Sequence, residues 1–136
     1  MAKMTQRIKE LFDKTPTVVL STATVDGIPN AVPVGAKKIL DAETILISNQ
    51  YLNKTLANMK ANPKVGLTFW QEREGYQLKG TATVETTGRR FEETVQWIEE
   101  LSAKVGRPLK SKGAVILQIE EIYSITSGPG AGKRLV

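Results

Sequence analysis

A polar segment that follows a strongly apolar stretch has the residue types best suited to binding an anion. Residues 45–49 read Ile-Leu-Ile-Ser-Asn, and Asn53-Lys54-Thr55 then opens a short helical stretch. The first N–H groups of a helix lack partners within the helix and carry partial positive charge, so they attract phosphate groups. Lys54 would add a full charge, and the hydroxyls of Ser48 and Thr55 would add donors. The alternative is that Asn53 simply caps the helix and Lys54 is solvated.

A second segment is suited to lie against a flat ring. Residues 31–35 read Ala-Val-Pro-Val-Gly. Proline removes one donor from a strand ladder and is typical of a sheet edge or an opening. Glycine at position 35 would let a ligand or another chain approach the backbone closely. An aromatic ring system could therefore bond to these peptide groups, although an irregular strand with a bulge explains the same pattern.

The glycine-rich tail looks like a phosphate-binding P-loop only superficially. Ser127 stands where the first glycine of that motif belongs, and Arg134 stands where Ser or Thr would bind magnesium. The tail also follows the last predicted strand without a helix after it. A nucleotide hydrolase is therefore disfavoured, and a flap or lid over a neighbouring site remains a hypothesis.

The composition excludes several kinds of chemistry. The chain has no cysteine and no histidine, so it offers no disulfide, no thiolate nucleophile and no imidazole base or ligand. Serine–histidine hydrolysis, cysteine–histidine proteolysis and zinc catalysis are excluded, and we predict no metal site. Carboxylates, lysines or a bound cofactor remain, and redox chemistry would have to come from the cofactor.

The net charge of +5 suggests an anionic partner. The positive residues are scattered as pairs, such as Lys37-Lys38 and Arg89-Arg90, and no block of five or more like charges appears. The charge invites a nucleic-acid hypothesis, but this pattern lacks a basic arm and suits any anionic ligand, including a phosphorylated cofactor, so its target stays open. The aromatic residues Trp70, Trp97 and Tyr123 could stack on a ring, but such residues are more often core or interface anchors.

Periodicity and turn residues predict the elements that must position these segments. Three helices are expected at residues 4–14, 53–61 and 89–105. Strands are expected at residues 17–24, 30–40, 44–48, 65–71, 76–86 and 114–126, with an Asp26-Gly27 hairpin, a bulge or close approach at Gly80 and a loop over residues 127–132.

The order of these elements predicts the fold class. We expect a mainly β, α+β protein: an antiparallel split β-barrel with flanking helices, closed or partly closed because closure removes exposed sheet edges. The sheet would have five hairpin-linked strands, or six if the long last strand bends. Residues 1–136 would form a single domain. No apolar run is long enough to cross a membrane and the N-terminus lacks a secretory signal, so we expect a cytoplasmic protein.

The chain resembles the FMN-binding split-barrel family, which includes pyridoxamine 5'-phosphate oxidase-like proteins and small bacterial FMN-binding proteins. The resemblance lies in residues 38–41, 44–48 and 54–58, continues through Asn62-Pro63-Lys64-Val65-Gly66-Leu67, and includes the Asp26-Gly27 hairpin. It is good over residues 17–86 and looser in the C-terminal third. It implies FMN as cofactor and a homodimer with the flavin at the interface.

The resemblance also implies residue roles. Lys54 and Thr55 match the phosphate-binding pair, and Ser48 and Asn49 match residues that contact phosphate or ribityl. The backbone of Val32, Pro33 and Val34 would border the isoalloxazine ring, and the segment near Ser127 and Pro129 would close over the flavin.

Departures from the family limit what the resemblance implies. The chain is shorter than pyridoxamine phosphate oxidases and lacks the histidine of their C-terminal substrate segment, so that activity is doubtful. Some relatives bind a deazaflavin or haem, but the missing axial ligands disfavour haem. The first hypothesis is an FMN-dependent oxidoreductase or electron carrier with an unidentified donor. The alternatives are a non-enzymatic nucleic-acid-binding barrel and a flavin storage or sensing module.

Overall fold

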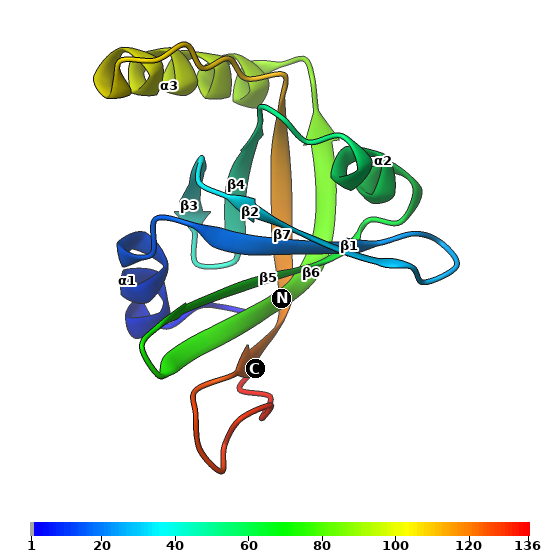
Figure 1. Ribbon diagram of the computed structural model, residues 1–136, viewed down its shortest axis with the longest axis vertical. Helices are drawn as coiled ribbons and strands as arrows, with labels where there is room; N and C mark the ends of the chain where they lie inside the picture. Colours follow the sequence, from blue (N-terminus) through cyan, green and yellow to red (C-terminus); the bar gives the residue numbers. More distant parts are fainter. Residues whose placement is uncertain (1) are drawn as a thin grey trace.

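The computed structural model describes residues 2–136 as an antiparallel sheet with three flanking helices (Figure 1). The helices are α1 (Gln6–Lys14), α2 (Lys54–Ala61) and α3 (Arg89–Val105). The strands are β1 (Val18–Ala23), β2 (Pro29–Val34), β3 (Lys37–Asp41), β4 (Thr44–Asn49), β5 (Lys64–Gln71), β6 (Glu74–Glu85) and β7 (Gly113–Ser124). None of the helices in this described part of the chain is long and apolar enough to cross a membrane.

The seven strands lie in the order β2-β1-β5-β6-β7-β4-β3, and every neighbouring pair is antiparallel. The expected fold class is confirmed, but the expected strand count of five or six is wrong. Residues 30–40 form two strands rather than one. The chain leaves β2 at Gly35 and enters β3 at Lys37, so consecutive strands lie at opposite edges of the sheet.

The sheet is not closed, contrary to the closed alternative among our expectations. Within residues 2–136 no ladder joins the edge strands β2 and β3. Pro29 and Pro33 have no backbone N–H, so β2 cannot supply regular donors to a second partner. The sheet therefore curls into a barrel with an open seam beside β2.

The core is built on a buried strand and an aromatic contact from α1. All six residues of β4 are buried. The ring of Phe12 packs edge-on against Phe69 with 5.3 Å between centroids. Thr5 caps the start of helix α1, because its Oγ1 accepts from the N–H of Ile8, and the helix ends before Pro16, as expected.

Helix α3 lies outside the curled sheet and extends beyond it (Figure 1). Trp97 packs against Leu46, Ala114 and Ile116 on the outer face of β4 and β7. Lys38 Nζ lies 4.6 Å from the centre of the Trp97 ring. The helix ends at Gly106, which has a left-handed φ of 73°. The predicted bounds of this helix are confirmed.

The predicted close approach at Gly80 is also confirmed. The register between β6 and β7 shifts between Lys79 and Gly80, which marks a bulge. A Cβ atom at position 80 would lie 2.0 Å from the carbonyl oxygen of Gln118. Because that oxygen belongs to backbone in the adjacent strand, no side-chain rotation can relieve the clash.

We predict that Gly80→Ala lowers the free energy of unfolding by about 3 kcal/mol, the upper end of the usual cost of overpacking. The matched variant is Gly66→Ala on the neighbouring strand, where the nearest atoms to a new Cβ lie at 3.9 Å. That variant should change stability by less than about 0.5 kcal/mol. Urea denaturation of both variants checks this, and equal stabilities would contradict the close approach at the bulge.

An ion pair ties α1 to the start of β6. Arg7 Nε donates to Glu74 Oε2 at 3.0 Å, a second guanidinium bond reaches Oε1, and the Tyr76 hydroxyl donates to Oε2 at 2.7 Å. These donors, the Arg7 guanidinium first, lower the pKa of Glu74 to about 2. A carboxyl with a lowered folded-state pKa stabilises the fold above its unfolded pKa, and this contribution is lost as the pH falls towards 2.

We predict that Glu74→Gln destabilises the protein at pH 7 by up to about 1 kcal/mol, because the pair is partly solvated. The difference from the wild type should shrink below pH 4 and vanish near pH 2. Thermal unfolding between pH 2 and 7 measures it, with Glu93→Gln in the exposed Arg89–Glu93 pair as the control. A difference that is constant with pH would rule out this contribution of Glu74.

Candidate functional site

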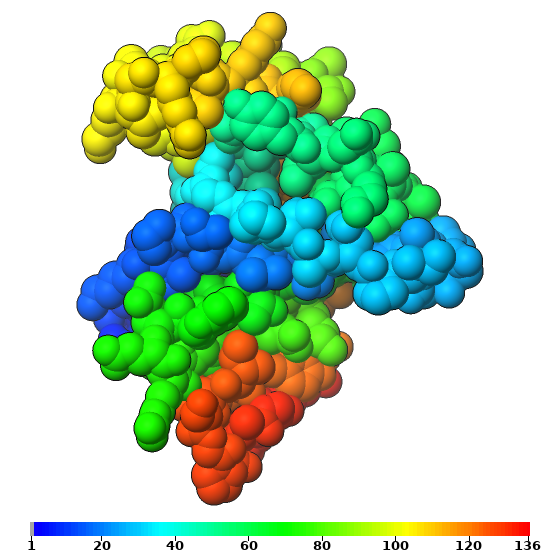
Figure 2. Space-filling view, viewed as in Figure 1, coloured from blue at the N-terminus to red at the C-terminus, as the bar shows by residue number. Residues whose placement is uncertain are grey.

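A cavity of about 790 Å³ opens at the seam beside β2, within the usual size range of ligand pockets. Figure 2 shows the surface hollowed beneath the overhanging α3. Four segments form its walls: the end of β2 with the following link, the end of β4 with the loop after it, the first turn of α2, and the end of α3 with its following loop. The lining residues include Pro16, Val32, Pro33, Val34, Gly35, Ala36, Ser48, Tyr51, Asn53, Lys54, Thr55, Leu101, Val105, Arg107 and Leu109.

The first turn of α2 faces this cavity without a side-chain cap. Asn53 has φ −124° and ψ −86°, and among residues 2–136 its side chain makes no capping bond. Its carbonyl oxygen accepts from the N–H of Ala57 at 3.1 Å, so the helix itself is regular. The alternative that Asn53 serves as an ordinary side-chain cap is therefore wrong. The first N–H groups of α2 lack the partner that such a cap would supply.

The charges on the cavity wall all have one sign. Lys54 and Arg107 line the cavity, and no Asp or Glu lies among the described residues that line it. Neither cation forms a salt bridge within the described part of the chain. Together with the start of α2, these two cations give the cavity a positive potential that favours an anionic ligand.

The end of β4 fixes the loop that carries α2. Asn49 is buried, and its Oδ1 accepts from the N–H of Leu52 at 3.0 Å. The carbonyl oxygen of Asn49 accepts from the N–H of Lys112 at 2.7 Å. Ser48 lines the cavity, and its hydroxyl donates to Ser111 Oγ at 2.8 Å. Asn49 therefore shapes the loop from behind, whereas Ser48 presents an oxygen at the cavity wall.

The wall formed by β2 offers peptide groups and small apolar side chains. Val32, Pro33 and Val34 line the cavity. Across the described residues β2 pairs with β1 alone, so its other edge remains available to a ligand. A flat ring could pack on these side chains and bond to the free peptide groups.

A third cation near the seam is already engaged. Lys37 Nζ donates to the carbonyl oxygen of Phe12 at 2.8 Å and lies 4.2 Å from the centre of that ring. Burial lowers the pKa of Lys37. This lysine fastens the end of α1 to β3 and does not line the cavity.

The structure brings together six of the predicted site residues and separates three. Val32, Pro33, Val34, Ser48, Lys54 and Thr55 line the cavity. Asn49 lies behind the wall, and Ser127 and Pro129 lie in the C-terminal tail. Figure 1 shows this tail at the end of the molecule opposite α3. It folds back on β7, where the N–H of Leu135 donates to the carbonyl of Ile122 at 2.7 Å. In this arrangement the tail does not cover the cavity of its own chain.

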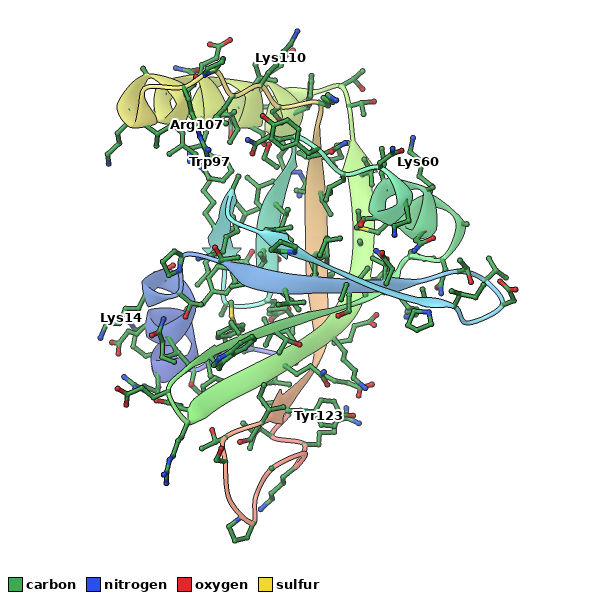
Figure 3. The ribbon with its side chains drawn as sticks, in the orientation of Figure 1. Lys14, Lys60, Trp97, Arg107, Lys110 and Tyr123 are labelled. Atoms are coloured by element: carbon green, nitrogen blue, oxygen red, sulfur yellow. The ribbon has the colours of Figure 1, made fainter. Side chains whose placement is uncertain are left out.

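The contribution of α3 was missed from the sequence. Leu101, Val105, Arg107 and Leu109 form one side of the cavity, and Figure 3 shows Arg107 beneath the helix end. A signal was present, because Val105 continues the apolar face of the helix. Val105 is 50% exposed, since that face extends beyond the sheet and over the cavity.

The aromatic residues considered as stacking partners lie elsewhere. Trp97 belongs to α3 and packs against the outer face of β4 and β7. The Tyr123 hydroxyl donates to Glu121, and Lys79 Nζ lies 4.9 Å from the centre of the Tyr123 ring. Trp70 is exposed on β5. The cavity instead has Tyr51 at its rim.

Comparison with known proteins identifies the family. The family model described as pyridoxamine 5'-phosphate oxidase matches residues 4–126. The chain is 40% identical to uncharacterized protein MJ0282 of Methanocaldococcus jannaschii, over 98% of this chain and 88% of that protein. The chain therefore belongs to the pyridoxamine 5'-phosphate oxidase family, as the resemblance in the sequence predicted.

Solved structures share the fold. HupZ of Group A Streptococcus is 27% identical and superposes with a TM-score of 0.81, covering 95% of this chain and 99% of that one. An FMN-binding protein from Syntrophomonas wolfei superposes with a TM-score of 0.74 at 17% identity, covering 89% of this chain and 85% of that one. At that identity the second likeness concerns the fold alone.

Proposed function

We propose that the cavity binds FMN and that the protein works as an FMN-dependent oxidoreductase or electron carrier. The observation that supports this proposal best is the uncapped start of α2, which faces a cavity lined by two cations and no carboxylate among the described residues. A phosphate dianion suits both the unpaired N–H groups and the charge of Lys54. The FMN-binding protein with the same fold adds support.

The residues present fit both ends of such a cofactor. Lys54, Thr55 and the first N–H groups of α2 would hold the phosphate, and Ser48 lines the same cavity. The exposed edge of β2 at Val32–Val34 would border the ring. Leu101 and Val105 supply apolar surface from α3, which would exclude water from the ring.

FMN supplies hydride and single-electron transfer when it is bound. The protein itself would bind the flavin, orient it and shield it from water. The chain contains no histidine, so the wall lacks a side chain whose ordinary pKa lies near neutrality. No described lining residue is an Asp or Glu that could accept a proton as a carboxylate. Protons would therefore exchange with solvent at the open mouth of the cavity.

The proposed assembly is a homodimer with the flavin at the interface. The cavity is open at the seam, and Ser127 and Pro129 are not among its lining residues. They belong to the C-terminal tail, which lies at the end of the molecule opposite α3 (Figure 1). Contact between these tail residues and the flavin therefore requires a second copy. A deazaflavin with a phosphate group would meet the same cationic wall, and the experiment below distinguishes it by direct comparison.

We predict that Lys54→Ala weakens FMN binding by about 10- to 150-fold, the range for loss of a hydrogen bond to a charged group. Riboflavin, which lacks the phosphate, should bind the variant and the wild type equally. Quenching of flavin fluorescence measures both affinities. Lys60→Ala is the matched control, because it removes the same charge from the last turn of α2, outside the cavity (Figure 3).

Unchanged FMN affinity in Lys54→Ala would contradict the proposed phosphate position. A wild-type protein that binds a deazaflavin but not FMN would show that the cofactor is a deazaflavin.

If the protein is an oxidoreductase, the FMN-loaded protein should oxidise a nicotinamide donor. Tight FMN binding without turnover in the presence of any donor would instead indicate a flavin storage or sensing module.

A further inference from the structure

Thr55 has a hydroxyl whose donor direction is set by the protein around it. Thr55 is the second residue of α2, lines the cavity, and is only 2% exposed. A threonine hydroxyl has one hydrogen to donate and can accept from two donors. Its usefulness to an anion therefore depends on whether that hydrogen is already engaged by the protein.

Two other buried threonines, Thr94 within α3 and Thr15 at the C-cap of α1, donate to the carbonyl oxygen four residues earlier. Thr15 Oγ1 donates to the carbonyl oxygen of Leu11 at 2.7 Å, and Thr94 Oγ1 donates to that of Arg90 at 2.6 Å. Both hydrogens are directed back along the helix. Thr55 differs, because its Oγ1 accepts from Asn30 Nδ2 at 2.9 Å and donates to no atom of residues 2–136. Its hydrogen is therefore free to point into the cavity.

Asn30 sits at the centre of a small polar network outside the cavity. Its Nδ2 donates to Thr55 on α2 and also to Thr22 Oγ1 on β1 at 3.2 Å. Asn58 Nδ2, also on α2, donates to Thr22 Oγ1 at 3.0 Å. The network thus ties α2 to β1 and β2, and neither asparagine lines the cavity.

We propose that Asn30 is a positioning residue that prepares Thr55 to donate to the phosphate of the flavin. An amide NH₂ group offers only hydrogens, so the Thr55 oxygen must accept and its own hydrogen is left for the ligand. Asn30 belongs to β2, whose later residues line the proposed ring wall. The same contact therefore fixes the phosphate end of the site relative to the ring end. This inference rests on the proposed FMN site.

The test is Asn30→Asp. A carboxylate only accepts hydrogen bonds, so the carboxylate introduced by this substitution would take the hydrogen of Thr55 and remove it from the phosphate. FMN affinity should fall by about ten-fold or more, since a bond to a charged group is lost. Riboflavin affinity should stay within about two-fold, because its ring would still meet β2 and no phosphate is involved.

Two controls separate this role from general effects. Asn58→Asp makes the same change within the same network but contacts Thr22 rather than Thr55, so FMN affinity should change by less than about two-fold. Thr55→Val removes the hydroxyl. In that background Asn30→Asp should weaken FMN binding no further, because the group through which Asn30 acts is gone.

Several results would overturn the role of Asn30. Equal losses of FMN and riboflavin affinity in Asn30→Asp would indicate only a structural effect. A loss that persists in the Thr55→Val background would indicate simple charge repulsion. If Asn30→Asp does not fold, Asn30→Leu replaces it, and a loss that is specific to FMN is again required. A wild type that binds no FMN would refute the proposed function itself, which distinguishes that failure from failure of the Asn30 inference alone.

Discussion

The candidate site depends most on the unpaired N–H groups at the start of α2, which lie next to Lys54 on the wall of an open cavity. A helix start of this kind is normally capped by its own side chain or exposed to water. Here Asn53 gives no side-chain cap, and the described cavity wall contains no carboxylate to neutralise the cations. An anionic ligand is the group that best completes this arrangement.

The rest of the fold holds that helix start against the other walls. The buried strand β4 and the Asn49 bonds set where the loop leaves the sheet. The Asn30–Thr55 contact sets the helix against β2. The overhang of α3 brings Leu101, Val105 and Arg107 across the gap. The open seam beside β2 is what makes the cavity accessible, so the failure of the sheet to close is part of the site.

Local patterns in the sequence predicted much of the fold. The bounds of α3, the bulge at Gly80 and the end of α1 before Pro16 follow from periodicity, glycine and proline, which act within a few residues. The division of residues 30–40 into β2 and β3 was not predicted. The break depends on pairing with β1 at one edge and with β4 at the other, which a local sequence pattern does not reveal.

The candidate site likewise combines residues that local sequence predicts with residues that only the fold brings together. Lys54 and Thr55 could be proposed because a strand, a polar loop and a helix start are adjacent in sequence. Arg107 and Asn30 could not be proposed from the sequence, because only the folded chain brings them to the cavity or to α2. Asn30, for example, contacts Thr55 from 25 positions away. Family resemblance named the residues near the flavin but not the polar network that orients one of them.

A crystal structure of the protein grown with FMN tests the central claim most directly. It should show the phosphate within hydrogen-bond distance of Lys54 Nζ and of the first N–H groups of α2, with the ring along Val32–Val34. FMN bound elsewhere on the molecule, or bound here with its phosphate directed away from α2 into solvent, would contradict the claim.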